Sequence, residues 1–366
     1  MYDGCISLEK APELPAMVLA ERCYYGMFSD CTSLTEAPEL PATELEYECY
    51  EFMFSNTALE EAPVLPATDL ADECYLAMFQ ECSKLKEAPE LPATKMYRLC
   101  YQQMFCGCES LKAAPALPAM LLAARCYAYM FKSCTSLEDA PELPATKLYP
   151  GCYNNMFNNC TSLEEAPELP ATNLYEGCYY AMFMSCTSLT EAPALPATIV
   201  AGECYGEMFG YSGLKKAPEL PATELVAYCY DYMFEGCESL EEAPYLPAKK
   251  LYPGCYEGLF ENCINLRHIK VGFDDWGNGT GTAGWTAGVP SGGLFECPEE
   301  LMVKYGAGYI PTGWSVNGTA PAATKSLAVP ATSAAGVRRL KPAASEAMEI
   351  QDRVADDIFA QNARIL

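Results

Sequence analysis

Carboxylates that recur at a fixed spacing are the side chains of this sequence with the most evident chemistry. One column stands directly before a recurring Ala-Pro pair and contains Glu36, Glu61, Glu87, Asp139, Glu165, Glu191 and Glu242. A second column directly follows the same pair and contains Glu39, Glu90, Glu142 and Glu168. Like charges about 5 Å apart repel one another, which favours the recruitment of cations. The columns therefore predict an acidic stripe that either is merely solvated, or binds divalent cations weakly or a basic partner.

Enzymatic chemistry has little support in the sequence. A glycosidase needs two carboxylates in one asymmetric pocket, and a ladder along the chain does not have that form. His268 is the only histidine, and no nucleophile elbow, P-loop or dinucleotide fingerprint occurs. We therefore predict no enzymatic activity, no catalytic residue, no cofactor and no resident metal, apart from the weakly bound divalent cations of the stripe.

The 21 cysteines could be buried thiols, disulfides or metal ligands. Most repeats carry a second cysteine eight residues after the first, as in Cys23 and Cys31, and two carry Thr57 or Ser212 there instead. This replacement argues against an obligatory pair, and no Cys-x-x-Cys motif supports a metal site. We favour reduced cysteines in the core. Cys106 occupies a variable position and is predicted to be an exposed, reactive thiol.

These residues are positioned by an internal repeat. A Cys-Tyr pair is followed two residues later by Met-Phe, once by Leu-Phe, and the first cysteines are Cys23, Cys49, Cys74, Cys100, Cys126, Cys152, Cys178, Cys204, Cys229 and Cys255. The step is 26 residues, with two steps of 25. Such a period predicts a solenoid of about ten units, each of which buries its apolar face only against its neighbours.

Each unit is predicted to contain one short helix and one short strand, which makes the fold an α/β solenoid. Pro150 and Pro253 precede the first cysteine by two residues and suit the first turn of a helix, which would run to the second cysteine. Its cysteines and Met would face the core, while Tyr and Phe form an aromatic row. The strand would occupy the few residues before each Ala-Pro, because Pro cannot donate to a ladder, and neighbouring units would pair in parallel.

Composition and charge limit the kinds of partner that the chain can bind. The net charge of −26 and the pI near 4.3 argue against nucleic acid, whose phosphates require Lys and Arg. No apolar run approaches the roughly 18 residues of a membrane span, and no signal peptide is present. Met1 aligns with Met27 of the motif, so the chain starts inside a repeat and we expect an incomplete N-terminus.

Four segments are predicted along the chain. Residues 1–263 form the repeat array, and residues 264–317, which contain all three tryptophans, form an aromatic cap over its last unit. Residues 318–344 are rich in Ala, Pro, Ser and Thr and indicate a flexible linker. Residues 345–366 indicate an amphipathic helix whose apolar positions include Ile350, Val354, Ile358, Phe359 and Ile365. This helix would dock onto a partner, self-associate or pack on the solenoid.

The repeat resembles a known family at the level of its motif. Cys-Thr-Ser-Leu-x-x-Ala-Pro-x-Leu-Pro-Ala, followed by Cys-Tyr-x-x-Met-Phe, is similar to the BspA-like leucine-rich repeats of bacterial surface proteins. The segment from Trp285 to Trp314 also resembles the end of such arrays, so that the resemblance covers about residues 1–316. It implies a leucine-rich-repeat-like array and a cell-surface or secreted location.

Two functions follow as expectations. The leading one is a non-enzymatic binding or adhesion module, at the cell surface or secreted, that presents an elongated acidic, Tyr-rich surface to a protein or glycan. The alternative is a structural subunit of a fibre, filament or phage appendage, which would self-assemble through its open N-terminal face and its C-terminal helix. A monomer would favour the module, and a defined oligomer would favour the subunit.

Overall fold

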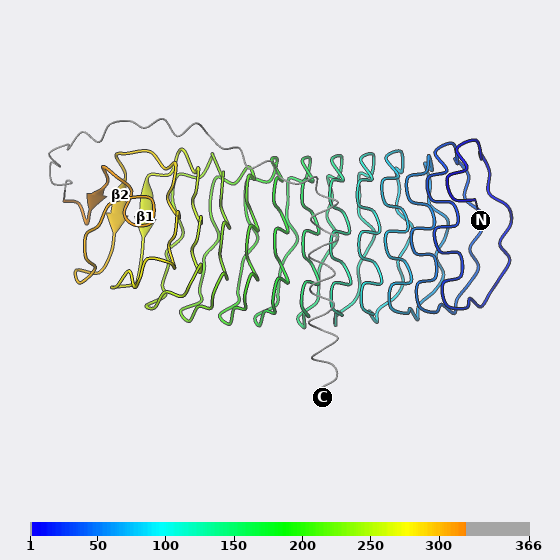
Figure 1. Cartoon of the computed structure of the whole chain (residues 1–366), viewed down its shortest axis with the longest axis horizontal. Coiled ribbons are helices and arrows are strands. Elements are labelled where there is room, and N and C mark those ends of the chain that lie inside the picture. The colour runs from blue at the N-terminus through cyan, green and yellow to red at the C-terminus, as the bar shows by residue number, and fades with distance from the viewer. Residues whose placement is uncertain (1, 320–366) are drawn as a thin grey trace. The chain divides into compact units, whose positions relative to one another are not determined.

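The protein is described by a computed structural model over residues 2–319, which belong to one compact unit. Within this unit, successive coils of the chain stack side by side in sequence order, from the blue N-terminal end to the orange end (Figure 1). None of these residues forms a helix able to cross a membrane. The predicted C-terminal helix lies outside the described residues, with its positions Ile350, Val354, Ile358, Phe359 and Ile365, as does nearly all of the predicted linker.

The Cys-Tyr-x-x-Met-Phe segment folds as a run of overlapping turns. Its backbone N–H groups alternate between two kinds of partner. The N–H of Met156 donates to the carbonyl of Tyr153 in the same coil at 3.1 Å, whereas the N–H of Phe157 donates to the carbonyl of Met182 in the next coil at 3.0 Å. One set of N–H groups thus closes turns, and the other set joins neighbouring coils.

The predicted short helices are wrong for residues 2–319, in which no helix occurs. An interior N–H of an α-helix bonds within its own helix and is not available to a neighbour. The alternation instead requires left-handed backbone within each coil, such as φ of 55° at Asn155 and 62° at Asn159. Gly and Asn adopt this conformation most readily. Half of the coils carry one of them seven residues after the first cysteine: Asn56, Gly107, Asn159, Gly236 and Asn262.

Parallel pairing occurs where the strands of the repeats are predicted, but it is only one residue long there. Single bridges join the residue before Ala-Pro to its equivalent one coil away, as for Glu61 with Glu87 and Ala113 with Asp139. The proline two residues later lacks an N–H, so the ladder cannot extend through it. The parallel arrangement is therefore correct, and the predicted strand length is not.

Longer pairing follows the last repeat. β1 (His268–Lys270), β2 (Leu294–Glu296) and β3 (Ser315–Val316) form a parallel sheet in the order β1-β2-β3. The ring of Trp285 lies 6.3 Å from that of Phe260, which is the last ring of the repeat ladder. All three tryptophans are buried: Trp276, Trp285 and Trp314. Aromatic side chains after residue 263 thus pack against the final repeat.

The core consists of columns in which one residue type repeats from coil to coil. The motif Tyr rings stack at 5.6–6.1 Å between centroids, and the motif Phe rings at 5.6–5.9 Å. From the second copy onward these rings are at most 1% exposed, which confirms the aromatic row. Since the motif tyrosines are buried, the expected Tyr-rich surface is limited to residues outside the motif. Two of these, Tyr149 and Tyr175, stack on one another at 5.9 Å.

The second cysteine of each coil bonds to a backbone carbonyl of the preceding coil. The Sγ of Cys160 lies 3.1 Å from the carbonyl oxygen of Phe131, and its equivalents make the same contact at 3.0–3.1 Å. Where the coil carries Thr57, the hydroxyl donates instead to the carbonyl of Phe54 in its own coil, at 3.0 Å. The position therefore requires a small side chain that can donate a hydrogen bond.

The two coils without a second cysteine are also the two that are one residue shorter. Leu follows the motif Phe by five positions in Phe54–Leu59 and Phe209–Leu214, and by six in Phe28–Leu34. In the second of the short coils, a Cβ on Gly213 would stand 2.2 Å from the carbonyl oxygen of Thr187 in the preceding coil. Both 25-residue steps are thus absorbed in the same turn, and in the second of them the backbone lies against the preceding coil.

All 21 cysteines are free thiols, and all except Cys5, Cys23 and Cys297 are buried. This confirms the prediction of buried thiols. The prediction that Cys106 is exposed is wrong, because neighbouring coils cover it and leave only 8% of it accessible. Burial also raises the pKa of the Cys106 thiol to about 11, which suppresses the reactive thiolate.

Thiol titration of the native protein checks this assignment. At neutral pH, only the half-buried Cys5, Cys23 and Cys297 should react rapidly with an aromatic disulfide reagent, because the remaining thiols are shielded. Cys106→Ser should leave the fast phase unchanged. A fast phase of about ten thiols would contradict the buried columns.

Substitution of one second cysteine tests the donor requirement. Cys160→Ala should lower the free energy of unfolding by about 1–2 kcal/mol, because it removes a buried sulfur and its bond to the Phe131 carbonyl. Cys160→Ser keeps a donor and should cost less. Equal destabilisation by Ala and Ser in chemical denaturation would show that the hydrogen bond contributes nothing.

Candidate binding groove on the acidic stripe

The acidic columns occupy an exposed face of the stacked coils. Every member of both columns is exposed: Glu36, Glu39, Glu61, Glu87, Glu90, Asp139, Glu142, Glu165, Glu168, Glu191 and Glu242. Single parallel bridges keep the first column in register between coils, as in the pair Glu61 and Glu87. The backbone therefore sets the spacing of these carboxylates.

Lysines limit the length of the first column. Lys10 forms an ion pair with Glu36 at 2.8 Å, and this contact lowers the pKa of Glu36. Farther along, Lys216 is bridged to Glu191 and replaces a carboxylate. Between these two lysines the column contains only acidic residues and Ala113. The stripe is thus most strongly acidic in the middle of the array.

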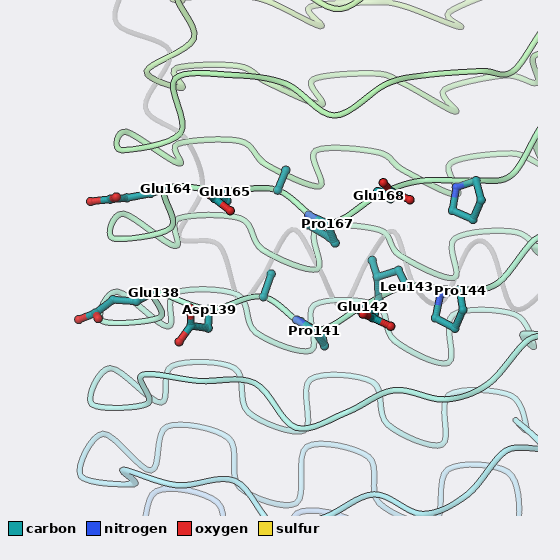
Figure 2. A pocket seen from close by; sticks show the side chains of 13 residues that line it. Glu138, Asp139, Pro141, Glu142, Leu143, Pro144, Glu164, Glu165, Pro167 and Glu168 are labelled. Carbon is teal, nitrogen blue, oxygen red and sulfur yellow. The ribbon is translucent and has the colours of Figure 1, made fainter.

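A groove of about 880 Å³ opens in this middle region between two adjacent coils (Figure 2). Six carboxylates line it, three from each coil: Glu138, Asp139, Glu142, Glu164, Glu165 and Glu168. Glu138 and Glu164 point in the same direction from their two coils in Figure 2. No Lys or Arg is among the lining residues, so the groove has a strongly negative potential.

The remaining lining comes from the Ala-Pro-x-Leu-Pro segments. These residues are Ala140, Pro141, Leu143, Pro144, Ala166, Pro167 and Pro170. Leu143 is 3% exposed and belongs to the core, so it closes the floor of the groove. Because each proline fixes its own φ, the floor is stiff. The groove therefore combines a preformed apolar floor with carboxylate acceptors.

Most of these carboxylates are available to a ligand. Among the described residues, only Glu138 of the six forms an ion pair, with Lys112 at 3.5 Å. The side chains of Glu138 and Lys112 are both more than half exposed. Such surface ion pairs contribute about 0–1 kcal/mol to stability. A cationic ligand could therefore replace Lys112 at little cost.

A second group of carboxylates lies beside the Cys-Tyr segment, and the sequence reasoning missed it. Glu48, Glu51 and Glu73 bring one carboxylate oxygen each within 4.8 Å of one another. Burial, and then the charges of Glu48 and Glu73, raise the pKa of Glu51 to about 8. The repeat carries a signal for this group, because Glu48 and Glu73 precede the first cysteine in neighbouring coils.

A third acidic group surrounds Asp231. The pKa of Asp231 is raised to about 7, mainly by burial and further by the charges of Glu203 and Glu207. Its Oδ1 is buried and has no hydrogen-bond partner. A Cβ on Gly206 would stand 2.6 Å from this oxygen, so the missing side chain at Gly206 provides the space for the carboxyl group.

The repeat and its stacking match a known family. The family model described as "BspA type Leucine rich repeat region" matches the chain in six copies, over residues 20–138, 73–202 and 101–241. The chain belongs to the BspA-type leucine-rich repeat family. The matched ranges include both coils of the acidic groove, which is therefore built from BspA-type repeats and not from an insertion.

Two solved structures are similar to this BspA-type repeat chain. A leucine-rich repeat protein from Bacteroides ovatus is 19% identical with a TM-score of 0.35, and the match covers 73% of this chain and 79% of that one. A leucine rich cell surface protein from Faecalibacterium prausnitzii is 15% identical with a TM-score of 0.36, covering 75% and 82%. The comparison with curated proteins gives no match.

The buried Asp231 predicts a pH dependence of stability. Its pKa is about 7 when folded and near 3.8 when unfolded, so the folded state binds more protons between these values. The free energy of unfolding should therefore fall as pH rises from about 4 to 7 and stay lower above that. Asp231→Asn should reduce the loss between pH 5 and pH 8 by about 1–2 kcal/mol, after allowance for solvent screening.

Thermal unfolding at the two pH values measures this difference. Glu219→Gln, which alters an exposed carboxylate, is the matched control and should leave the pH dependence of the wild type intact. If Asp231→Asn and wild type lose equal stability between the two pH values, Asp231 does not carry the proton.

Proposed function

We propose that this BspA-type repeat protein is a non-enzymatic binding module, at the cell surface or secreted, whose acidic groove holds a basic, extended segment of a partner protein. The single observation that carries the proposal is the groove with six carboxylates, three from each of two coils, and no basic lining residue. The similarity of the repeats to the BspA-like repeats of bacterial surface proteins supports the proposed surface location.

The shape of the groove supports an extended segment. An extended peptide presents alternate side chains to the same side, about 6–7 Å apart. Lys or Arg side chains on that side can reach the carboxylates, while the aliphatic parts of those side chains cover the Pro and Leu143 floor. The leucine-rich-repeat stack supplies carboxylates at regular intervals, so neighbouring coils can add weak contacts to those of the groove.

Electrostatics favours a protein over other ligands. The net charge of −26 attracts cationic partners over a distance set by the salt concentration. A neutral glycan gains nothing from this field, so glycan binding by the acidic groove has less support. A self-assembling fibre subunit would instead bury the ends of the stack, and mass photometry of the full chain separates these proposals, since the binding module should be monomeric.

A defined cationic peptide tests the groove. A fluorescent peptide of alternating Arg and Ser should bind the wild-type chain, with anisotropy showing weaker affinity at about 300 mM than at about 50 mM salt. The variant Asp139→Asn, Glu142→Gln, Glu165→Gln, Glu168→Gln should lose at least about tenfold in affinity, because four acceptors become neutral. A matched peptide with Gln in place of Arg should not bind.

A control elsewhere on the stripe makes the result specific. Glu87→Gln with Glu90→Gln neutralises the same two columns outside the lining residues and should change the affinity less than twofold, by the weak effect of distant exposed charges. The groove proposal fails if this control and the groove variant weaken binding equally per charge removed, since binding would then reflect only the net charge.

A further inference from the structure

The group formed by Glu48, Glu51 and Glu73 has the geometry of a cation site. Each residue offers one carboxylate oxygen, and these atoms all lie within 4.8 Å of one another. Ligand oxygens lie 2.3–2.6 Å from Ca²⁺, so two oxygens on opposite sides of one ion are separated by about 4.6–5.2 Å. The separation of the three oxygens is therefore compatible with contacts to a single ion.

Burial leaves one of these carboxylates without a partner. Glu48 is 6% exposed and Glu51 is 7% exposed. The Oε2 atom of Glu51 is buried and accepts no hydrogen bond. A buried polar atom without a partner is costly, and a buried charge without compensation is more so. Glu51 thus lacks what a bound cation would supply.

Two arginines flank the group from the solvent side. Arg22 contacts both carboxylate oxygens of Glu48, with Nε 2.6 Å from Oε2 and Nη2 3.1 Å from Oε1, and the guanidinium of Arg98 contacts Glu73. The Arg22 and Arg98 side chains are 63% and 43% exposed, whereas those of Glu48 and Glu73 are 8% and 13% exposed. The arginines therefore pair with two of the three carboxylates from outside, and the third, Glu51, forms no ion pair among the described residues.

We propose that Glu48, Glu51 and Glu73 bind one hard divalent cation, with Ca²⁺ preferred. The ligands are all oxygens, which suits Ca²⁺ or Mg²⁺ and not Zn²⁺. Mg²⁺ requires oxygens at 2.0–2.1 Å in strict octahedral geometry, so it places opposite oxygens only about 4.1 Å apart. A more open set of three buried or half-buried carboxylates, completed by water, fits the larger and less demanding Ca²⁺.

The site would join two coils at a place where the stack is irregular. Glu48 and Glu51 belong to one coil and Glu73 to the next. The step from Cys49 to Cys74 is one of the two 25-residue steps. A bound ion would therefore cross-link the coils beside a shortened turn. This site is separate from the acidic groove, because none of its three ligands lines that groove.

Calorimetric titration of the full chain with Ca²⁺, after removal of metal by a chelator, tests the proposal. We expect one saturable site with a Kd on the order of 10⁻⁴–10⁻³ M, the range of weak extracellular calcium sites, and weaker binding of Mg²⁺. Glu51→Gln should weaken Ca²⁺ binding at least about tenfold, since it removes the uncompensated ligand charge. Glu44→Gln, an exposed carboxylate of the same coil, is the matched control and should bind as wild type does.

Folding of the variants is measured in parallel by thermal unfolding with and without Ca²⁺. Wild type and Glu44→Gln should melt at higher temperature with Ca²⁺, and Glu51→Gln should not respond. If Glu51→Gln does not fold, Glu73→Gln replaces it with the same expectation. The site is refuted if the calorimetry shows no saturable binding, or if the folded Glu51 or Glu73 variant titrates as wild type does.

Discussion

Backbone hydrogen bonds between neighbouring coils are the constraint on which the rest of this structure depends. In the Cys-Tyr-x-x-Met-Phe segment, alternate N–H groups point along the stack, as from Phe157 to the Met182 carbonyl at 3.0 Å. These bonds leave no freedom of register, because a slip by one residue would exchange the groups that close turns with those that join coils. Identical side chains must therefore lie above one another, and the Tyr and Phe columns stack as a consequence.

The same register explains why the repeat tolerates a missing residue only in one turn. The turn between the motif Phe and the following Leu lies at the end of the hydrogen-bonded segment, so shortening it does not shift the bonds before it. Both short coils have lost their residue there, and both carry Thr57 or Ser212 in place of the second cysteine. A hydroxyl is a stronger donor than a thiol and can reach a carbonyl from the altered backbone, as Thr57 does.

The sequence was sufficient for the repeat, the buried columns and the exposed acidic face, because these depend on which positions stay apolar in every copy. The sequence was misleading about the predicted helix, because the first cysteine, the Met and the second cysteine are four residues apart. Residues at this spacing lie on one face of a helix, but they also lie on one side of a segment in which successive residues alternate between two sides. The sequence could not show the groove, whose walls combine side chains from two coils. Cys106 was misplaced for the same reason, since its burial is imposed by neighbouring coils and not by its own position in the repeat.

The stacking of the coils places the carboxylates of this chain in two different environments. Those beside the Ala-Pro pair are held at the surface, since proline ends the backbone pairing there and leaves their side chains in water. Those beside the Cys-Tyr pair are drawn between coils, where the inter-coil hydrogen bonds bring the backbones together and burial raises the pKa of Glu51 and Asp231. A surface carboxylate keeps its charge available for a mobile partner at little cost. A carboxylate between coils has a charge that folding alone does not compensate, so it must either hold a proton or acquire a cation.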